Sequence, residues 1–261
     1  MRSTWASWQP ADGQTAPCHA AGQTSGMPAA QALVVGASSD IGRAIAVQLA
    51  DLEDDVVLWG RDHDRLSAAA DACAAAGART WMDTPDVTDR AAVSASLDSI
   101  AARGPLSAVV YAAGVFDWSA ADRADAAAWE QVLTVNLTAA ACLTTLVLPQ
   151  LLHAVPSALV YIGSGASRQV FANNAAYVAS KHGLAGLAGA TFLDVRDRGV
   201  KVSVVSPGLV AAGAGAYSEA GRDRPETLLT VGDVAAAVRF VVTFPPTGCP
   251  TEITLAPQRT P

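Results

Sequence analysis

From Ala32 onward the sequence alternates between short apolar runs and longer helical stretches, and this alternation constrains the fold more than any other feature. The apolar runs are continuous, as in strands that are buried on both faces of a sheet. Because each strand is followed by a helix, the pattern predicts a mostly parallel sheet that is flanked by helices. The seven expected strands are 32–35, 55–59, 78–82, 106–111, 158–162, 201–205 and 252–255. The six expected helices lie at about 41–52, 62–76, 89–103, 125–152, 174–198 and 231–244.

These elements use almost the whole chain after residue 30, so we expect one doubly wound α/β domain of the Rossmann type over 29–261. Residues 1–28 are rich in Gly, Ala, Gln, Thr, Ser and Pro, with Trp5 and Trp8 isolated, and this composition predicts a disordered tail. No apolar run follows Arg2, so we expect no secretory signal there.

Charge and composition exclude several classes of function. The net charge is −7 and the pI is about 5.0, so we expect no nucleic-acid partner, which would need a basic surface. The most apolar stretch, Leu133 to Leu152, contains Asn136 and Pro149, and it predicts a buried helix rather than a membrane span. The cysteines are far apart, as are the histidines, so we expect no metal site, reduced thiols and a cytoplasmic location. The cysteines are Cys18, Cys73, Cys142 and Cys249.

A glycine-rich turn directly follows the first expected strand. In the segment VVGASSDIGRAIA (34–46), Gly36 and Gly42 stand at the two ends of a strand-to-helix turn. Glycine lets a backbone approach a pyrophosphate, and the helix start offers free N–H groups and a positive dipole end. The turn therefore predicts a nucleotide site. Its expected contacts are Gly36, Ser38, Ser39, Asp40, Ile41 and Gly42.

The end of the second strand bears on which nucleotide binds. NAD-binding and S-adenosylmethionine-binding folds usually carry an acid here that holds ribose hydroxyls, whereas this chain has Gly60-Arg61. A guanidinium suits a 2′-phosphate, so Arg61 favours NADP(H) over NAD(H) and argues against a methyltransferase. The alternative is that Arg61 merely pairs with Asp62 or Asp64 on the surface.

An acidic residue also follows the third strand, where Asp86 and Val87 are expected to contact the cofactor. The carboxylate of Asp86 could accept a hydrogen bond from an adenine amino group. Capping of the next helix by Asp86 or Thr88 is the competing interpretation, and the two uses do not exclude each other.

The strongest signal is the segment YIGSGASRQVFANNAAYVASKHGL (161–184). Tyr177 and Lys181 are four residues apart on an expected helix, so both project from one face. Ser164 follows the fifth strand and lies thirteen residues before Tyr177, at the sheet edge that also carries the phosphate turn. We interpret the three as one catalytic group, with an ordinary surface pair as the alternative for Tyr177 and Lys181.

In these features the chain resembles the short-chain dehydrogenase/reductase family, in its short single-domain branch, over about 30–256. The matching pieces are GASSDIG (36–42), DVT (86–88), AAG (112–114), Asn136 in VNLT, Ser164, Tyr177 with Lys181, and Pro207-Gly208. Each piece is common alone, but together and in this order they are highly specific.

The resemblance implies a role for each matching residue. Ser164 would orient the substrate oxygen, and Tyr177 would be the general acid or base. Lys181 would bind the nicotinamide ribose and lower the pKa of the tyrosine, and Asn136 would complete a water-linked proton path or else form a helix-bend hydrogen bond. Further cofactor contacts are expected from Ala113, Gly114, Tyr177, Lys181, Pro207, Gly208 and Val210. The sequence departs from the family pattern at Val35, Ala112 and Ala212. These departures affect expected cofactor contacts and leave the proton-transfer residues unchanged.

The predicted reaction is an NADP(H)-dependent interconversion of a ketone or aldehyde with an alcohol, on a small-molecule substrate. Two alternatives remain: a redox-neutral step such as epimerisation, dehydration or cyclisation, and a nucleotide-sensing binding protein. We expect the Gly/Ala-rich segment 209–226 to form a mobile substrate lid. Phe171 and Tyr217 are expected to line an apolar substrate pocket, with plain packing as the alternative.

Two of the expected helices, 125–152 and 174–198, are apolar over more than one narrow stripe. One face of each would cover the sheet, which leaves a second face, including Ala179, Gly186 and Ala190, exposed in a monomer. An exposed apolar face of that length predicts a homo-oligomer, either a tetramer or a dimer. Close packing within the chain is the alternative for the small residues.

Overall fold

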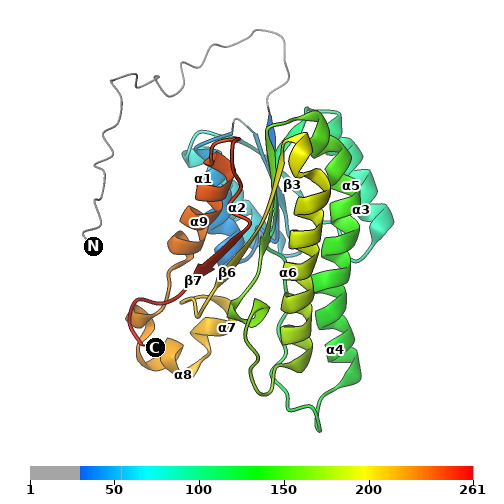
Figure 1. Ribbon diagram of the computed structural model, residues 1–261. Helices are drawn as coiled ribbons and strands as arrows, with labels where there is room; N and C mark the ends of the chain where they lie inside the picture. Colours follow the sequence, from blue (N-terminus) through cyan, green and yellow to red (C-terminus); the bar gives the residue numbers. More distant parts are fainter. Residues whose placement is uncertain (1–29, 54, 261) are drawn as a thin grey trace, which may run out of the picture.

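The computed structural model describes residues 30–53 and 55–260, which form three layers with a sheet in the middle (Figure 1). All strands of the sheet are parallel, in the order β3-β2-β1-β4-β5-β6-β7. The strands are β1 (Gln31–Val35), β2 (Asp55–Trp59), β3 (Arg79–Asp83), β4 (Leu106–Tyr111), β5 (Ser157–Ile162), β6 (Val200–Pro207) and β7 (Glu252–Leu255). The doubly wound α/β prediction is therefore confirmed. The expected tail, 1–28, lies outside the described residues.

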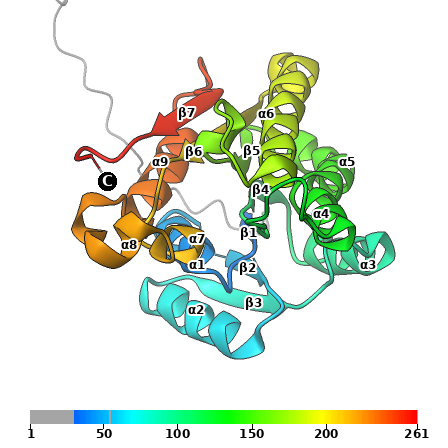
Figure 2. The same cartoon turned by 90° about the horizontal axis from the view of Figure 1, so that it is seen from below.

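Helices cover both faces of the sheet, as Figure 2 shows from below. One face carries α1 (Asp40–Ala50), α2 (His63–Ala75) and α9 (Val231–Thr243), and the other carries α3 (Arg90–Ala101), α4 (Ala126–Leu133), α5 (Ala139–His153) and α6 (Ala175–Val195). In β1, Val34 packs into the first layer and Leu33 into the second, and both are fully buried. The apolar runs are continuous because these strands face a helix layer on each side.

The expected helix over 125–152 is one continuous stretch with an irregular middle. Between α4 and α5, Thr134–Thr138 form a π-helical turn, which buries Asn136 completely. Turns of this kind occur often at functional sites. Ala126–His153 is also the one helical stretch of the described chain that is long and apolar enough to cross a membrane. Its contacts with β4, β5, α3 and α6 are those of a helix that covers a sheet.

The carboxyl ends of the strands meet at one edge, and the strand order reverses between β1 and β4. Open α/β sheets bind ligands at such a switch point. The expected lid segment lies next to this edge and contains two short helices, α7 (Gly213–Ala216) and α8 (Glu219–Asp223). Ser218 caps the start of α8, because its Oγ accepts a 3.0 Å hydrogen bond from the Gly221 N–H.

Candidate active site

The turn between β1 and α1 admits only glycine at two positions. Gly36 has φ +91°, and a Cβ there would lie 2.7 Å from the Ala113 nitrogen. A Cβ on Gly42 would lie 2.1 Å from the Gly36 carbonyl oxygen. The two glycines therefore let the turn press against both the loop after β4 and the first turn of α1.

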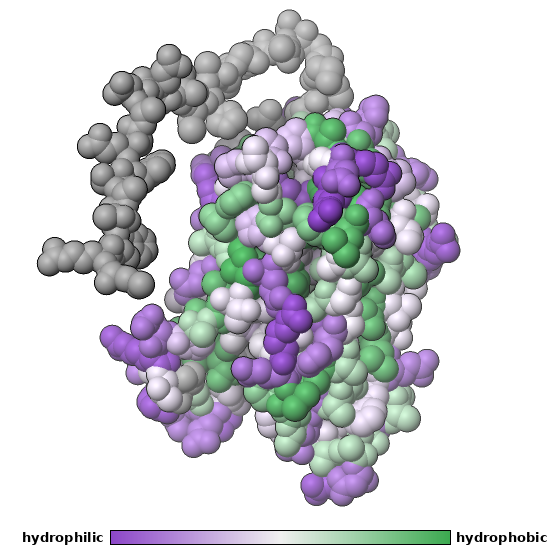
Figure 3. All heavy atoms as spheres, in the orientation of Figure 1, coloured by the Kyte–Doolittle hydropathy of each residue, from purple (hydrophilic) through white to green (hydrophobic). Residues whose placement is uncertain are grey.

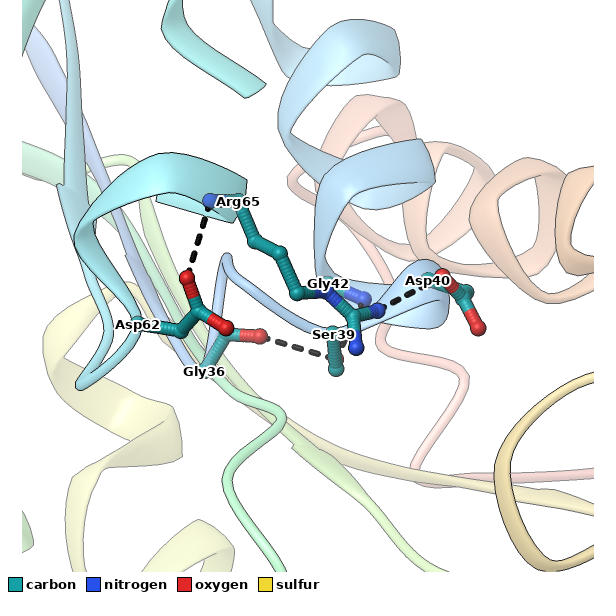
Figure 4. Close-up of polar contacts among 6 residues, drawn as sticks. All are labelled: Gly36, Ser39, Asp40, Gly42, Asp62 and Arg65. Carbon is teal, nitrogen blue, oxygen red and sulfur yellow. Dashed lines mark hydrogen bonds and ion pairs between the residues drawn. The ribbon is translucent and has the colours of Figure 1, made fainter. Parts of the chain in front are cut away.

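Ser39 fixes this turn to the start of α1 (Figure 4). Its Oγ donates to the Gly36 carbonyl at 2.8 Å and accepts from the Gly42 N–H at 3.0 Å. The neighbouring carboxylate of Asp40 points away from the turn and pairs with the Arg65 guanidinium at 2.8 Å. Ile41 packs against the core.

A cavity of about 220 Å³ opens beside the turn. It brings together many of the expected cofactor residues, which come from the ends of β1, β2, β3 and β4: Gly36, Ser38, Ser39, Arg61, Asp86, Val87, Ala113 and Gly114. Arg65, in the first turn of α2, also lines it and was not anticipated. Its signal in the sequence is the spacing of four residues from Arg61 at a helix start.

Arg61 is not engaged by the acids beside it. Asp62 caps α2 by accepting from the Arg65 N–H at 3.0 Å, and Asp64 lies 4.0 Å from the His63 ring. Among the ion pairs of the described residues, none joins Arg61 to either carboxylate. The geometry therefore does not support the alternative that Arg61 merely pairs with Asp62 or Asp64 on the surface.

Asp86 forms a small turn of its own rather than a helix cap. Its Oδ1 accepts from both the N–H and the hydroxyl of Thr88, at 2.9 Å and 2.7 Å. These hydrogen bonds, and more weakly the Arg61 charge, lower the pKa of the Asp86 carboxyl. The capping expectation was wrong in detail, because Asp89 caps α3 by accepting from the N–H groups of Ala91 and Ala92.

Lys181 and Tyr177 lie together on α6. The ammonium of Lys181, a residue that is 5% exposed, donates to the Ile162 carbonyl at 2.8 Å. Its Nζ is 5.7 Å from the centre of the Tyr177 ring. Burial lowers the pKa of Lys181 to about 8, because a charge is costly away from water.

The pKa of Tyr177 moves in the direction opposite to the expectation. Burial raises it, and a hydrogen bond with the Ser164 side chain opposes the rise without cancelling it. The Lys181 ammonium, which donates to the Ile162 carbonyl, is not among the causes of this shift. The lowering of the tyrosine pKa that the resemblance implies for Lys181 stays a prediction.

Asn136 links the loop after β4 to α6. Its Oδ1 accepts from the Val115 N–H at 2.8 Å, and its Nδ2 donates to the Val115 carbonyl at 2.9 Å and to the Ser180 hydroxyl at 3.1 Å. Its amide is therefore satisfied outside its own helix. A Cβ on Gly114 would lie 3.4 Å from the Asn136 Oδ1 and 3.7 Å from the Lys181 Nζ, so both polar ends converge on this glycine.

Several expected contacts lie at the same sheet edge but outside the cavity. Pro207 ends β6, and the Gly208 N–H donates to the Leu255 carbonyl at 2.8 Å. The side chain of Val210 is buried in the core. Of the departures from the family pattern, Val35 and Ala212 are buried, and the Ala112 N–H donates to the Val35 carbonyl at 2.8 Å. No group of three His, Cys, Asp or Glu within 30–53 and 55–260 could hold a metal ion.

The aromatic ring that packs on Tyr177 is one that sequence reasoning missed. Phe116 meets Tyr177 edge-on, with ring centroids 4.8 Å apart and planes at 71°. Trp118 follows, 5.9 Å from Phe116. The expected substrate residues Phe171 and Tyr217 are 48% and 80% exposed. The available signal was the two aromatic residues that stand two and four positions after Gly114, in the loop that follows β4.

A glycine turn at the switch point, with a serine, tyrosine and lysine group at the same sheet edge, is the arrangement typical of dinucleotide-binding α/β proteins. A family model described as short chain dehydrogenase matches residues 30–223. A 3beta-hydroxysteroid dehydrogenase from Mediterraneibacter gnavus is 32% identical over 205 residues, which cover 77% of this chain and 69% of that protein. The chain belongs to the short-chain dehydrogenase/reductase family.

Solved structures agree with this assignment. A metagenomic short-chain oxidoreductase in complex with NADP is 30% identical, with a TM-score of 0.76 over 88% of this chain and 98% of that one. An actinorhodin polyketide ketoreductase with NADPH is 25% identical, with a TM-score of 0.80 over 87% of this chain and 96% of that one.

Proposed function

We propose that this protein is an NADP(H)-dependent oxidoreductase that interconverts a ketone or aldehyde with an alcohol. The observation that carries the proposal is that Tyr177, with the Ser164 hydroxyl bonded to it and Lys181 beside it, lies at the sheet edge that carries the phosphate turn. A protein that only sensed a nucleotide would have no use for a half-buried proton donor.

The residues at the cavity fit the cofactor. The turn from Gly36 to Ser39 suits the pyrophosphate, because glycine removes the Cβ that would obstruct its approach. Arg61 and Arg65 supply two guanidinium groups for a 2′-phosphate, and Asp86 faces the same cavity for the adenine. When bound, the reduced nicotinamide supplies a hydride to the carbonyl carbon.

Side chains of the protein carry out the proton transfer. Ser164 donates a hydrogen bond to the substrate oxygen as negative charge develops on it. Tyr177 gives its hydroxyl proton to that oxygen, and its raised pKa keeps the phenol protonated at neutral pH. Lys181 holds a positive charge beside the phenolate that results. A protonated phenol is the form of Tyr177 that reduction of the carbonyl requires.

The comparisons support this proposal. Two structural relatives were solved with NADP or NADPH, one of them a ketoreductase, and one sequence relative is a hydroxysteroid dehydrogenase. These names suit hydride transfer between an alcohol and a carbonyl group. A cytoplasmic location and a small-molecule substrate remain part of the proposal.

The test is to follow NADPH absorbance while the purified protein is offered ketones, acyl-thioesters and quinones. We expect stoichiometric NADPH loss and alcohol formation with at least one ketone. Product formed without net NADPH loss would instead indicate the redox-neutral alternative. NADPH binding without turnover of any compound would indicate a sensing protein, and either result would overturn the proposal.

A further inference from the structure

Two aromatic side chains stand exposed on the loop between β4 and α4. Phe116 is 40% exposed and Trp118 is 65% exposed, and their ring planes are tilted by only 33°. We call these two residues the aromatic wall. Large aromatic side chains gain more from burial than any others, so an exposed pair that takes no part in the core indicates a binding surface.

One end of the aromatic wall lies against Tyr177, the proposed proton donor. Phe116 packs edge-on against the Tyr177 ring at 4.8 Å, and Trp118 extends the surface away from it. A molecule whose carbonyl oxygen reaches the Tyr177 hydroxyl therefore lies beside Phe116. The rest of such a molecule can cover Trp118 only if it continues as an apolar body.

The wall is held in place at both ends. The Val115 N–H donates to the Asn136 Oδ1 at 2.8 Å, and the Asn136 Nδ2 donates to the Val115 carbonyl at 2.9 Å, so this backbone is fixed on both sides. Ser119 pairs with Asn174 in a parallel bridge and also hydrogen-bonds the Asp117 carboxylate. A surface that is ordered in advance loses little freedom when a ligand covers it, which favours flat and rigid ligands.

The chemistry of the wall narrows the ligand class. Between Phe116 and Ser119 the one charged group is the carboxylate of Asp117, and this is already bonded to the Ser119 hydroxyl. The Ser119–Asn174 bridge brings the chain after β5 alongside the wall, and Phe171, 48% exposed, stands on that chain. Because no side chain within 116–119 is basic and the one carboxylate is already hydrogen-bonded, the exposed rings suit a neutral apolar ligand.

We propose that Phe116 and Trp118 form a stacking surface for the substrate, and that the enzyme takes a carbonyl compound with a planar, apolar fused ring. The inference rests on the oxidoreductase function proposed above and adds the substrate class of that site. A face of an aromatic ring stacks on Trp118 while the carbonyl group reaches Tyr177.

The test compares two ketones that share the reacting ring: β-tetralone, which carries a fused benzene ring, and cyclohexanone, which lacks it. At saturating NADPH, we expect the full-length protein to have a kcat/KM for β-tetralone at least tenfold above that for cyclohexanone. Trp118→Ala should lower that preference about tenfold through KM, and Trp118→Phe should restore most of it, because stacking needs only an aromatic face. The matched control is Phe240→Ala, an exposed aromatic residue at the far end of α9.

A second measurement separates this inference from the reductase function. Ligand-observed NMR of β-tetralone with the NADPH-saturated protein reports binding without turnover. Binding that weakens in Trp118→Ala but not in Phe240→Ala supports the wall even if no ketone is reduced. Equal kcat/KM values for both ketones, or β-tetralone binding that is the same with and without Trp118, would overturn it while leaving the reductase function standing.

Discussion

The Nζ of Lys181 lies 5.7 Å from the centre of the Tyr177 ring, and burial moves the pKa values of these two residues in opposite directions. The lysine pKa falls to about 8, whereas that of the tyrosine rises from its ordinary value. As pH increases, the ammonium therefore loses its proton before the phenol does. Titratable neighbours whose pKa values are pushed apart are typical of acid–base sites, and this relationship supports the proposal that Tyr177 is the acid.

Replacement of Tyr177 by phenylalanine should remove turnover and leave cofactor binding intact. The variant loses the hydroxyl that gives up the proton, and general acid–base groups contribute about 10²–10⁴-fold to rate. We expect kcat for ketone reduction to fall by at least about 100-fold, with an NADPH dissociation constant close to that of wild type. Tyr161→Phe is the control, since its hydroxyl bonds Thr144 within the core. A Tyr177→Phe variant that kept more than about a tenth of the rate would contradict the assignment.

The rate of carbonyl reduction should fall as pH rises through about 8. Lys181 is charged below its lowered pKa of about 8 and neutral above it, so the charge that stabilises the phenolate is lost there. The measurement is kcat against pH at saturating NADPH. Lys201→Met should keep the same profile, because Lys201 is a partly buried lysine that bonds the Val242 carbonyl away from the site. A kcat that stays flat to pH 10 would show that the Lys181 charge is not used.

Arg61 should set the preference for NADPH. A charge-assisted hydrogen bond contributes about 1.5–3 kcal/mol, so Arg61→Ala should raise the KM for NADPH at least about tenfold and leave that for NADH nearly unchanged. Arg65→Ala should act in the same direction but more weakly, because Arg65 already pairs with Asp40. Arg196→Ala, at the exposed end of α6, serves as control. Equal changes for both cofactors would remove the 2′-phosphate argument.

Gly36→Ala tests the close approach of the phosphate turn, with Gly77→Ala as its matched control. Both glycines have positive φ, at +91° and +104°, so alanine costs about 1–2 kcal/mol at either position. A new Cβ at Gly36 also meets the Ala113 nitrogen at 2.7 Å, whereas that at Gly77 meets nothing within 4 Å. Urea unfolding should show a larger loss for Gly36→Ala, and NADPH binding should weaken in that variant alone. Equal losses would mean that the turn can open to accept a methyl group.

The sequence predicted the strands and the long helices because the core imposes its pattern on them. β2 matches its expected bounds, whereas α6 starts one residue later and ends three residues earlier than expected, with a 3₁₀ turn over Arg196–Arg198. The turn glycines and Ser164, Tyr177 and Lys181 could also be predicted, since each holds a fixed place relative to a strand end or a helix face.

What the sequence could not predict depends on contacts between distant segments. The direction of the Tyr177 pKa shift follows from burial, and Phe116, 61 residues away in the chain, packs on the tyrosine ring. The position of Arg65 at the cavity depends on its hydrogen bond to Asp40, which joins the first turn of α2 to the first turn of α1. The π-helical turn at Asn136 has no local sequence signal either, because the bonds of its amide go to Val115 and Ser180.

The outer surface of α6 carries the remaining prediction, a homo-oligomer. Ala179, Gly186 and Ala190 are exposed, and a Cβ on Gly186 would meet nothing within 4 Å. Gly183 differs, since a Cβ there would lie 2.7 Å from Leu137, so this glycine serves packing within the chain. Much of the surface over α6 is pale or green in the hydropathy colours (Figure 3). The helical stretch Ala126–His153 packs beside α6 and also has an exposed apolar side, since only 39% of its most apolar 18 residues are buried.

An apolar helix face with room beside its glycine suits the same face of a second copy about a two-fold axis. Gly186→Arg places a long charged side chain in that contact and should convert the oligomer to a monomer near 26.6 kDa in light scattering. Ala74→Arg adds the same side chain on the exposed side of α2 and should leave the oligomer intact. Because Tyr177 and Lys181 lie on α6, the monomeric Gly186→Arg variant should also be less active than the wild type while it remains folded. A wild-type protein that is already a clean monomer at micromolar concentration would refute the prediction.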